Sequence, residues 1–309
     1  MRPLVATYAT VPYRDVDPTW FAAVSYLFMF GMMFGDVAHG LAIVAVGLAA
    51  RYGHGRLGRL RAAAPLLLGA GASATVFGLL YGEAFGPTGL VPTWWLRPLE
   101  EPVTLLVVGV AVGAVLLSLT TVLSIVNRWR EQGAALAFFD ASAVPGALLL
   151  LAVGSIVLAS ATGASWAWVS AALLAAAGLT LVFVGLLVRA GGHGGAIAEA
   201  SVELFDTVLR LGSNLISFAR LAAFGLTHAV ITTVVWQGST VLWGRGGWLL
   251  GAAAVLFLVG NVVAIALGAL VAAVQALRLE YYEIFSRLFT DYGRPFLPWH
   301  IPTRRTETP

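Results

Sequence analysis

The stretch Asn214–Val230, NLISFARLAAFGLTHAV, places one arginine near the centre of an otherwise apolar helical segment. An arginine at the middle of a lipid bilayer costs from ~3 to more than ~10 kcal/mol, so such residues usually face an aqueous path or a partner. The alternative is a structural arginine that pairs with Asp206 or with backbone carbonyls. The surrounding sequence indicates whether Arg220 faces an aqueous path or partner, or whether it is structural.

The composition predicts a membrane protein. Of the 309 residues 59% are hydrophobic and 11% are charged, and the mean hydropathy is +0.88. Such values lie outside the range of soluble globular domains. The chain has no cysteine, which excludes disulfides and thiolate metal sites, and no lysine, which excludes a Walker A nucleotide loop. The five histidines form no HExxH motif, and we expect no cofactor, no metal site and no nucleic-acid partner.

Long apolar stretches give the expected fold class, an all-α polytopic membrane protein. They run roughly over 18–50, 62–82, 103–126, 142–161, 166–188, 203–243 and 246–286. A single span needs about 20 residues, so we interpret the first stretch as two short helices that turn at FGDVAHG. This gives about eight transmembrane helices. The last two exceed the bilayer thickness, and we expect them to be strongly tilted or to extend into the cytoplasm.

The arginines predict the orientation of these helices. Loops rich in arginine are usually cytoplasmic, and only Arg97 and Arg245 fall in the opposite loops if the first stretch is a pair. We therefore expect both termini in the cytoplasm, in the cytoplasmic membrane of a prokaryote whose arginine-only basic residues are typical of a GC-rich genome. The expected organisation is a short cytoplasmic segment over 1–17, a membrane domain over 18–290 with arginine helices over about 203–243 and 246–287, and a cytoplasmic tail over 291–309.

Polar residues gather on one face of the helix that carries Arg220. At 100° per residue, four polar residues lie within about 60° of the arginine: Asp206, Ser213, Ser217 and Thr227. His228 lies about 80° from it around the helix axis. Asp206 is about 20 Å away along the axis, so it is not a direct partner of Arg220. The final helix carries Arg278 with Gln275 one turn before it. Two such arginines with small polar neighbours indicate the walls of a hydrated path, with a counter-ion on another chain.

Several motifs resemble one family, in order along nearly the whole chain. SNLISFARLAAFGLTHA resembles the arginine helix of subunit a, or subunit I, of the vacuolar-type rotary ATPases. FMFGMMFGDVAHG resembles its first membrane pair, and GLLYGEAFG, LSIVNRWRE and LRLEYYEIFSRLF follow in the family's order. The sequence departs from the family in two ways. The family's cytosolic stalk-binding half is not expected in this chain, which reads as a fragment, a proteolysed chain or a naturally short subunit. Gly268 also stands where many relatives carry an acid.

The resemblance implies a non-catalytic, proton-translocating stator subunit. Its partners would be the lipid bilayer, the stalk subunits and a rotating ring of small membrane subunits that carry a mid-membrane carboxylate. Arg220, Arg278 and Gln275 would face that ring between two half-channels. The candidate relay residues are Asp206, Ser213, Ser217, Thr227, His228, Glu280 and Glu283. Asp206 and Glu280 are candidates to replace the acid that is missing at Gly268.

Three further residues and two other functions complete the sequence-based expectations. We expect Asp36 and His39 to be structural and Glu83 to lie at the outer interface. A second hypothesis is a stand-alone ion transporter or channel that uses the same scaffold without a ring. A third is a degenerate assembly subunit, which the presence of both arginines and Gln275 disfavours.

Overall fold

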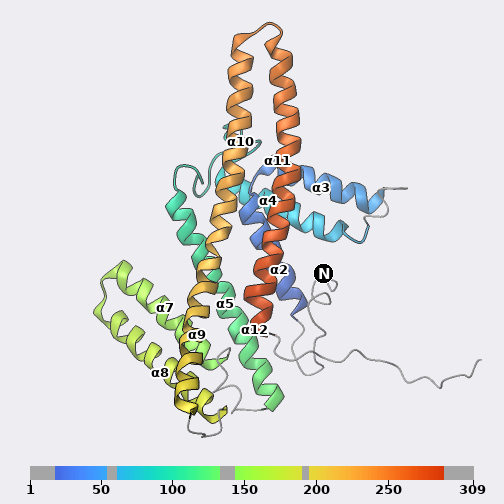
Figure 1. Ribbon diagram of the computed structural model, residues 1–309. Helices are drawn as coiled ribbons and strands as arrows, with labels where there is room; N and C mark the ends of the chain where they lie inside the picture. Colours follow the sequence, from blue (N-terminus) through green and yellow to red (C-terminus); the bar gives the residue numbers. More distant parts are fainter. Residues whose placement is uncertain (1–17, 54–60, 133–142, 190–194, 289–309) are drawn as a thin grey trace, which may run out of the picture.

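The computed structural model describes residues 18–53, 61–132, 143–189 and 195–288, and within these ranges every regular element is a helix (Figure 1). The expected terminal segments 1–17 and 291–309 lie outside the described residues. The helices are α2 Thr19–Phe34, α3 Val37–Tyr52, α4 Ala64–Tyr81, α5 Pro102–Gln132, α7 Val144–Thr162, α8 Ser165–Arg189, α9 Ala196–Ser217, α10 Ala219–Arg245, α11 Leu249–Leu279, the π-helical segment η2 Glu280–Phe285 and α12 Ser286–Leu288.

The helices match the apolar stretches of the sequence and confirm the all-α membrane class. Five described segments are long and apolar enough to cross a bilayer, and three shorter apolar helices accompany them. The first apolar stretch is indeed a pair, because α2 ends at Phe34 and α3 begins at Val37. Asp36 sets this turn: its Oδ1 accepts a hydrogen bond from the backbone N–H of His39 at 2.9 Å and caps α3.

The last two spans differ in detail from the sequence prediction. The first runs over 50 residues from Ala196 to Arg245 and is divided into α9 and α10 at Phe218. The second runs over 40 residues from Leu249 to Leu288 and includes η2. At 1.5 Å per residue these runs measure about 75 and 60 Å, far more than the ~30 Å hydrocarbon core of a bilayer. In Figure 1 the long α10/α11 hairpin runs in a different direction from the short α3/α4 and α7/α8 hairpins.

A central core joins α2, α4, α5, α10 and α11. Its fully buried side chains include Met29, Phe34, Leu105, Phe218 and Leu221. The α7/α8 hairpin packs beside this core through α5 and α9. Small residues allow close helix contacts where no hydrophobic force drives association within lipid. A Cβ at Gly113 of α5, for example, would overlap the ring of Phe218.

Two sides of the molecule follow from the chain path. We call the outer side the one that holds the α2–α3 turn, the loop 82–101 and the α10–α11 turn. The α2–α3 turn and the loop are joined directly, since Val37 N donates to Glu83 O at 2.9 Å and Gly86 N donates to Asp36 Oδ2 at 3.0 Å. The opposite, inner side holds the end of α3, the start of α4 and the start of α9.

Candidate functional site

Two arginines lie on the open side of the α10/α11 pair. Arg220 is the second residue of α10 and is partly exposed, while Arg278 near the end of α11 is exposed. The two guanidinium groups are close enough to repel each other. Among the described residues neither makes a hydrogen bond or an ion pair. Gln275, one turn before Arg278, has a buried side-chain Oε1 without a hydrogen-bond partner in the described part of the chain. The sequence-based expectation of a counter-ion on another chain therefore stays a prediction.

The α9–α10 junction fixes the position of Arg220. Phe218 is completely buried against Gly113 of α5, and Leu221 and Ala222 on the same side are also completely buried. The arginine therefore projects away from the core rather than into it. The backbone of Arg220 is held by packing on one face of the helix. On the other face its side chain is accessible to a group of another subunit.

An inner polar approach ends at Glu283, a carboxylate that interacts electrostatically with Arg220. The amide nitrogen of Asn214, turned towards its acceptors, donates to Glu283 Oε2 at 2.9 Å and to Arg210 O at 3.0 Å. A cavity of about 410 Å³ opens beside Asn214 between α7, α8, α9 and α12, with polar lining residues Glu203, Thr207, Arg210, Asn214, Tyr282, Ser286 and Arg287.

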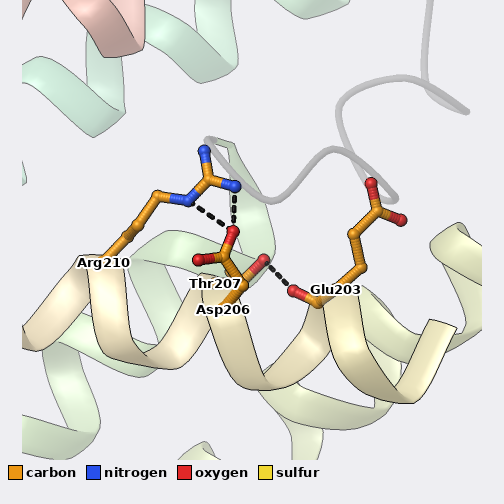
Figure 2. Close-up of polar contacts among 4 residues, drawn as sticks. All are labelled: Glu203, Asp206, Thr207 and Arg210. Atoms are coloured by element: carbon orange, nitrogen blue, oxygen red, sulfur yellow. Dashed lines mark hydrogen bonds and ion pairs between the residues drawn. The ribbon is translucent and has the colours of Figure 1, made fainter. Parts of the chain in front are cut away.

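Asp206 lies in the inner half of α9 and is paired with a neighbour on the same helix. Figure 2 shows both its contacts with Arg210, one of them the 2.8 Å hydrogen bond from Arg210 Nε to Asp206 Oδ2. Both side chains are largely solvent-accessible. The Glu203 side chain lies apart from this pair, and its backbone carbonyl accepts a hydrogen bond from the Thr207 hydroxyl. Asp206 is thus close to the inner cavity but not to Arg220.

A buried histidine pair lies on the outer side of Arg220. His39 Nδ1 and His228 Nε2 are 3.2 Å apart, and His39 Nε2 is 2.9 Å from Asn261 Oδ1. Asp36 completes the cluster, because one potential ligand atom from each of Asp36, His39 and His228 lies within 4.8 Å of the others. The expectation that the histidines form no metal cluster is therefore wrong for these residues. His39 and His228 are 189 positions apart, so no local motif could reveal their contact.

An outer cavity reaches the loop beside this cluster. It has a volume of about 260 Å³, and its polar lining residues include Glu83, Arg97, Glu100, Thr233 and Gln237. Glu83 lies in the loop after α4, outside the membrane-spanning segments, and its side chain is 5% exposed. Burial, and secondarily the charge of Asp36, raises the pKa of Glu83 to about 8. Glu83 is therefore buried in its loop rather than at a solvated interface.

The remaining predicted residues separate into an exposed and a buried group. Ser213 and Thr227 lie on the open face, and the Thr227 hydroxyl donates to Ala223 O of its own helix. Glu280 points the other way: the Ser25 hydroxyl of α2 donates to its carboxylate at 2.8 Å. The neighbours of Gly268 are His228 and Phe34. Neither Glu280 nor Asp206 is therefore next to Gly268, where the acid of the relatives is expected.

Comparison with known proteins shows which proteins this chain resembles. A sequence profile of the V-type ATPase 116kDa subunit family matches residues 2–65. The A-type ATP synthase subunits I of Pyrococcus abyssi and Aeropyrum pernix are 28% and 29% identical to the chain, and each alignment covers 96% of it. The V-type ATP synthase subunit I 2 of Treponema pallidum is 41% identical over 108 residues, 35% of this chain and 23% of that protein. The chain covers 45% and 49% of the two archaeal proteins, about half of their length.

Fold and site together define a polytopic helical membrane protein with two arginines on an open helical face between an inner and an outer polar approach. The relatives extend over nearly the whole of this arrangement. Over nearly its whole length the chain is similar to the subunits I of A-type ATP synthases, and its first part matches the V-type ATPase 116kDa subunit family.

Proposed function

We propose that this chain is the proton-translocating membrane stator subunit of a V-type rotary ATPase or ATP synthase. The observation that carries the proposal is the placement of Arg220 between two separate polar cavities. The inner one, of about 410 Å³, reaches Asn214, which donates a hydrogen bond to Glu283. The outer one, of about 260 Å³, reaches Glu83 and Thr233. Thr233 follows Arg220 by 13 residues on α10, which is about 20 Å along the helix.

Buried apolar residues separate the two approaches. Leu221 and Ala222 are completely buried next to Arg220, and Phe34 packs on His228 with ring centroids 4.4 Å apart. Two aqueous paths that do not join cannot pass a proton directly from one side to the other. A proton then has to leave one path, travel on a moving group and enter the second path. This arrangement supports half-channels rather than a continuous pore.

The moving group is a carboxylate on a ring of small membrane subunits. A carboxylate that faces lipid has to be protonated, because an ionised one is too costly in a low-dielectric medium. Opposite Arg220 the ionised form is favoured, and guanidinium itself does not deprotonate. Arg220 would thus strip each arriving carboxyl of its proton, and Arg278 and Gln275 would line the same contact. The inner half-channel would pass Asp206 and Glu283, and the outer one would pass His228.

The open face of α10 and α11 suits such a partner. Only 11% of the most apolar window in Leu249–Leu288 is buried within the chain, so this span has to be covered by lipid or by other helices. Thr227, Arg220 and Arg278 lie on exposed or partly exposed positions of these helices. A ring of apolar helices with one carboxylate each would cover the face and bring an anion to the two cations. The stalk subunits of the family would hold the chain against rotation.

The test is ATP-driven proton uptake by vesicles that contain the assembled complex. We expect Arg220→Lys and Arg220→Ala to abolish uptake while the complex still assembles, because lysine keeps the charge but lacks the planar five-donor group and loses its proton more readily when desolvated. Arg278→Lys should reduce uptake less. Arg245→Ala, at the outer end of α10, is the matched control and should pump normally. Near-normal pumping by Arg220→Ala would show that the arginine is structural and would refute the proposal.

A further inference from the structure

The outer cluster has the composition and spacing of a transition-metal site. Asp36 at the α2–α3 turn, His39 in the first turn of α3 and His228 of α10 are all buried. Their potential ligand atoms lie within 4.8 Å of one another. Two histidines and one carboxylate form a common three-ligand set for zinc, which then takes its fourth ligand from water or substrate.

The hydrogen bonds around His39 fix the state of its ring. Asn261 Nδ2 donates to Phe257 O at 2.8 Å, so Asn261 Oδ1 is the acceptor that faces His39. His39 Nε2 therefore carries a hydrogen, and in the neutral ring Nδ1 presents a lone pair towards His228. Histidines that bind metals almost always donate their second ring N–H to such an oxygen, which fixes the tautomer and the ring orientation. Asn261 supplies this support before any metal arrives.

The distances between the ligands suit a tetrahedral ion. Zinc–nitrogen bonds of about 2.0–2.1 Å at a tetrahedral angle separate two nitrogens by roughly 3.3 Å. His39 Nδ1 and His228 Nε2 are 3.2 Å apart. Asp36 accepts one backbone N–H on each oxygen, at 2.9 and 3.0 Å, and an ionised carboxylate has about four lone-pair sites. It can therefore keep its structural bonds and still ligate.

The second nitrogen of His228 can take the displaced hydrogen. His228 Nδ1 is buried and has no hydrogen-bond partner among the described residues. When an ion occupies the space between the rings, the hydrogen on His228 Nε2 moves to Nδ1 through exchange with water, without a net change in protonation. The Gly86 segment that binds Asp36 lies between Glu83 and Pro87, two residues that line the outer cavity. This cavity gives an ion access from the outer side.

We propose that Asp36, His39 and His228 bind a divalent transition-metal ion of the zinc class from the outer side. Imidazole nitrogens favour zinc, copper and nickel, whereas magnesium and calcium prefer sites made of oxygens. The consequence for transport rests on the proposed function: an ion bound at His228 occupies the outer half-channel and blocks it. External zinc is then an inhibitor of proton translocation.

Binding is measured on the purified full chain in detergent, independently of transport. Zinc titration by calorimetry should give one site per chain, and cobalt should give the absorption bands of a tetrahedral complex. His39→Gln and His228→Gln should each weaken binding by more than about tenfold, the loss that follows when only a hydrogen-bond partner of a metal ligand is changed. His54→Gln and His193→Gln are matched controls and should bind as the unmutated chain does. The proposal is overturned if the unmutated chain binds no zinc, or if His39→Gln and His228→Gln bind zinc as tightly as the unmutated chain does.

Two further measurements keep the test decisive. If a variant does not fold, ¹⁵N-histidine spectra of the unmutated chain replace it: two of the five imidazoles should shift on addition of zinc, and any other pattern contradicts the site. In vesicles of the assembled complex, zinc on the outer side should inhibit proton uptake. Binding without inhibition would contradict the place of His228 on the outer half-channel in the proposed function, whereas absent binding overturns the metal site alone.

Discussion

Gly268 shows how a single residue defines the outer half of the site. A Cβ at this position would lie 2.8 Å from His228 Nδ1 and 2.9 Å from Phe34 Cε2. Phe34 is completely buried and His228 is 5% exposed, so neither ring has free space to move into. The acid that the family resemblance implies here does not fit beside the imidazole. In this chain the space next to Gly268 is filled by the rings of His228 and Phe34.

Gly268→Ala tests this packing. We expect the added methyl group to force His228 or Phe34 out of place and to destabilise the chain by about 1–3 kcal/mol, as overpacking usually does. Thermal unfolding in detergent measures the change. Gly251→Ala on the same helix is the control, because a Cβ there meets nothing within 4 Å and alanine favours a helix over glycine. Equal melting temperatures for the two variants would mean that the rings are loosely packed.

At the scale of elements, the junction between α9 and α10 is the feature that orients the arginine. Phe218 leaves the helical pattern, is completely buried and contacts Gly113 of α5. Gly109, one turn earlier on α5, faces the Phe218 carbonyl less tightly, because a Cβ added there would lie 3.3 Å from that oxygen. Close packing of small residues in one helix against a neighbour is common in membranes. Here it determines where Arg220 projects.

Substitutions on α5 should therefore affect transport without touching the arginine. Gly113→Ala places a methyl group inside the Phe218 ring volume and should shift the junction, whereas Gly109→Ala requires only a small adjustment. We expect Gly113→Ala to lower both the melting temperature and ATP-driven proton uptake, and Gly109→Ala to change each much less. Uptake that is equal in the two variants would show that the junction does not position Arg220.

Apolar length and turn chemistry were sufficient to predict most of the apolar helices from the sequence. The split at Gly35 and Asp36 could be predicted because 33 residues are too many for one span and because a capping aspartate follows an apolar run. The π-helical segment could not, since its i→i+5 pattern depends on tertiary packing. An undisturbed α-helical period puts Glu283 on another face than Arg278, yet the carboxylate interacts with Arg220. The His39–His228 contact could not be predicted for a different reason, because it joins distant parts of the chain.

At the scale of the whole molecule, the distribution of arginines predicts one orientation in the membrane. The α2–α3 turn and the loop 82–101 are tied together by two hydrogen bonds, so they lie on the same side. Successive helices then alternate, which puts the α7–α8 turn and the α10–α11 turn on that outer side as well. Arginines Arg51 and Arg61 flank the opposite, inner connection. The positive-inside rule assigns this inner side to the cytoplasm.

Cysteine labelling tests this orientation directly, because the chain has no cysteine of its own. Leu90→Cys and Gly163→Cys, both at exposed positions of outer loops, should react with a membrane-impermeant maleimide added outside intact cells. Gly55→Cys should react only after the membrane is opened, since the sequence around it is rich in arginine and should stay in the cytoplasm. Labelling of all three from outside would mean that α2 and α3 do not form two crossings. Labelling of Gly55→Cys alone from outside would invert the molecule and exchange the inner and outer half-channels proposed for Arg220.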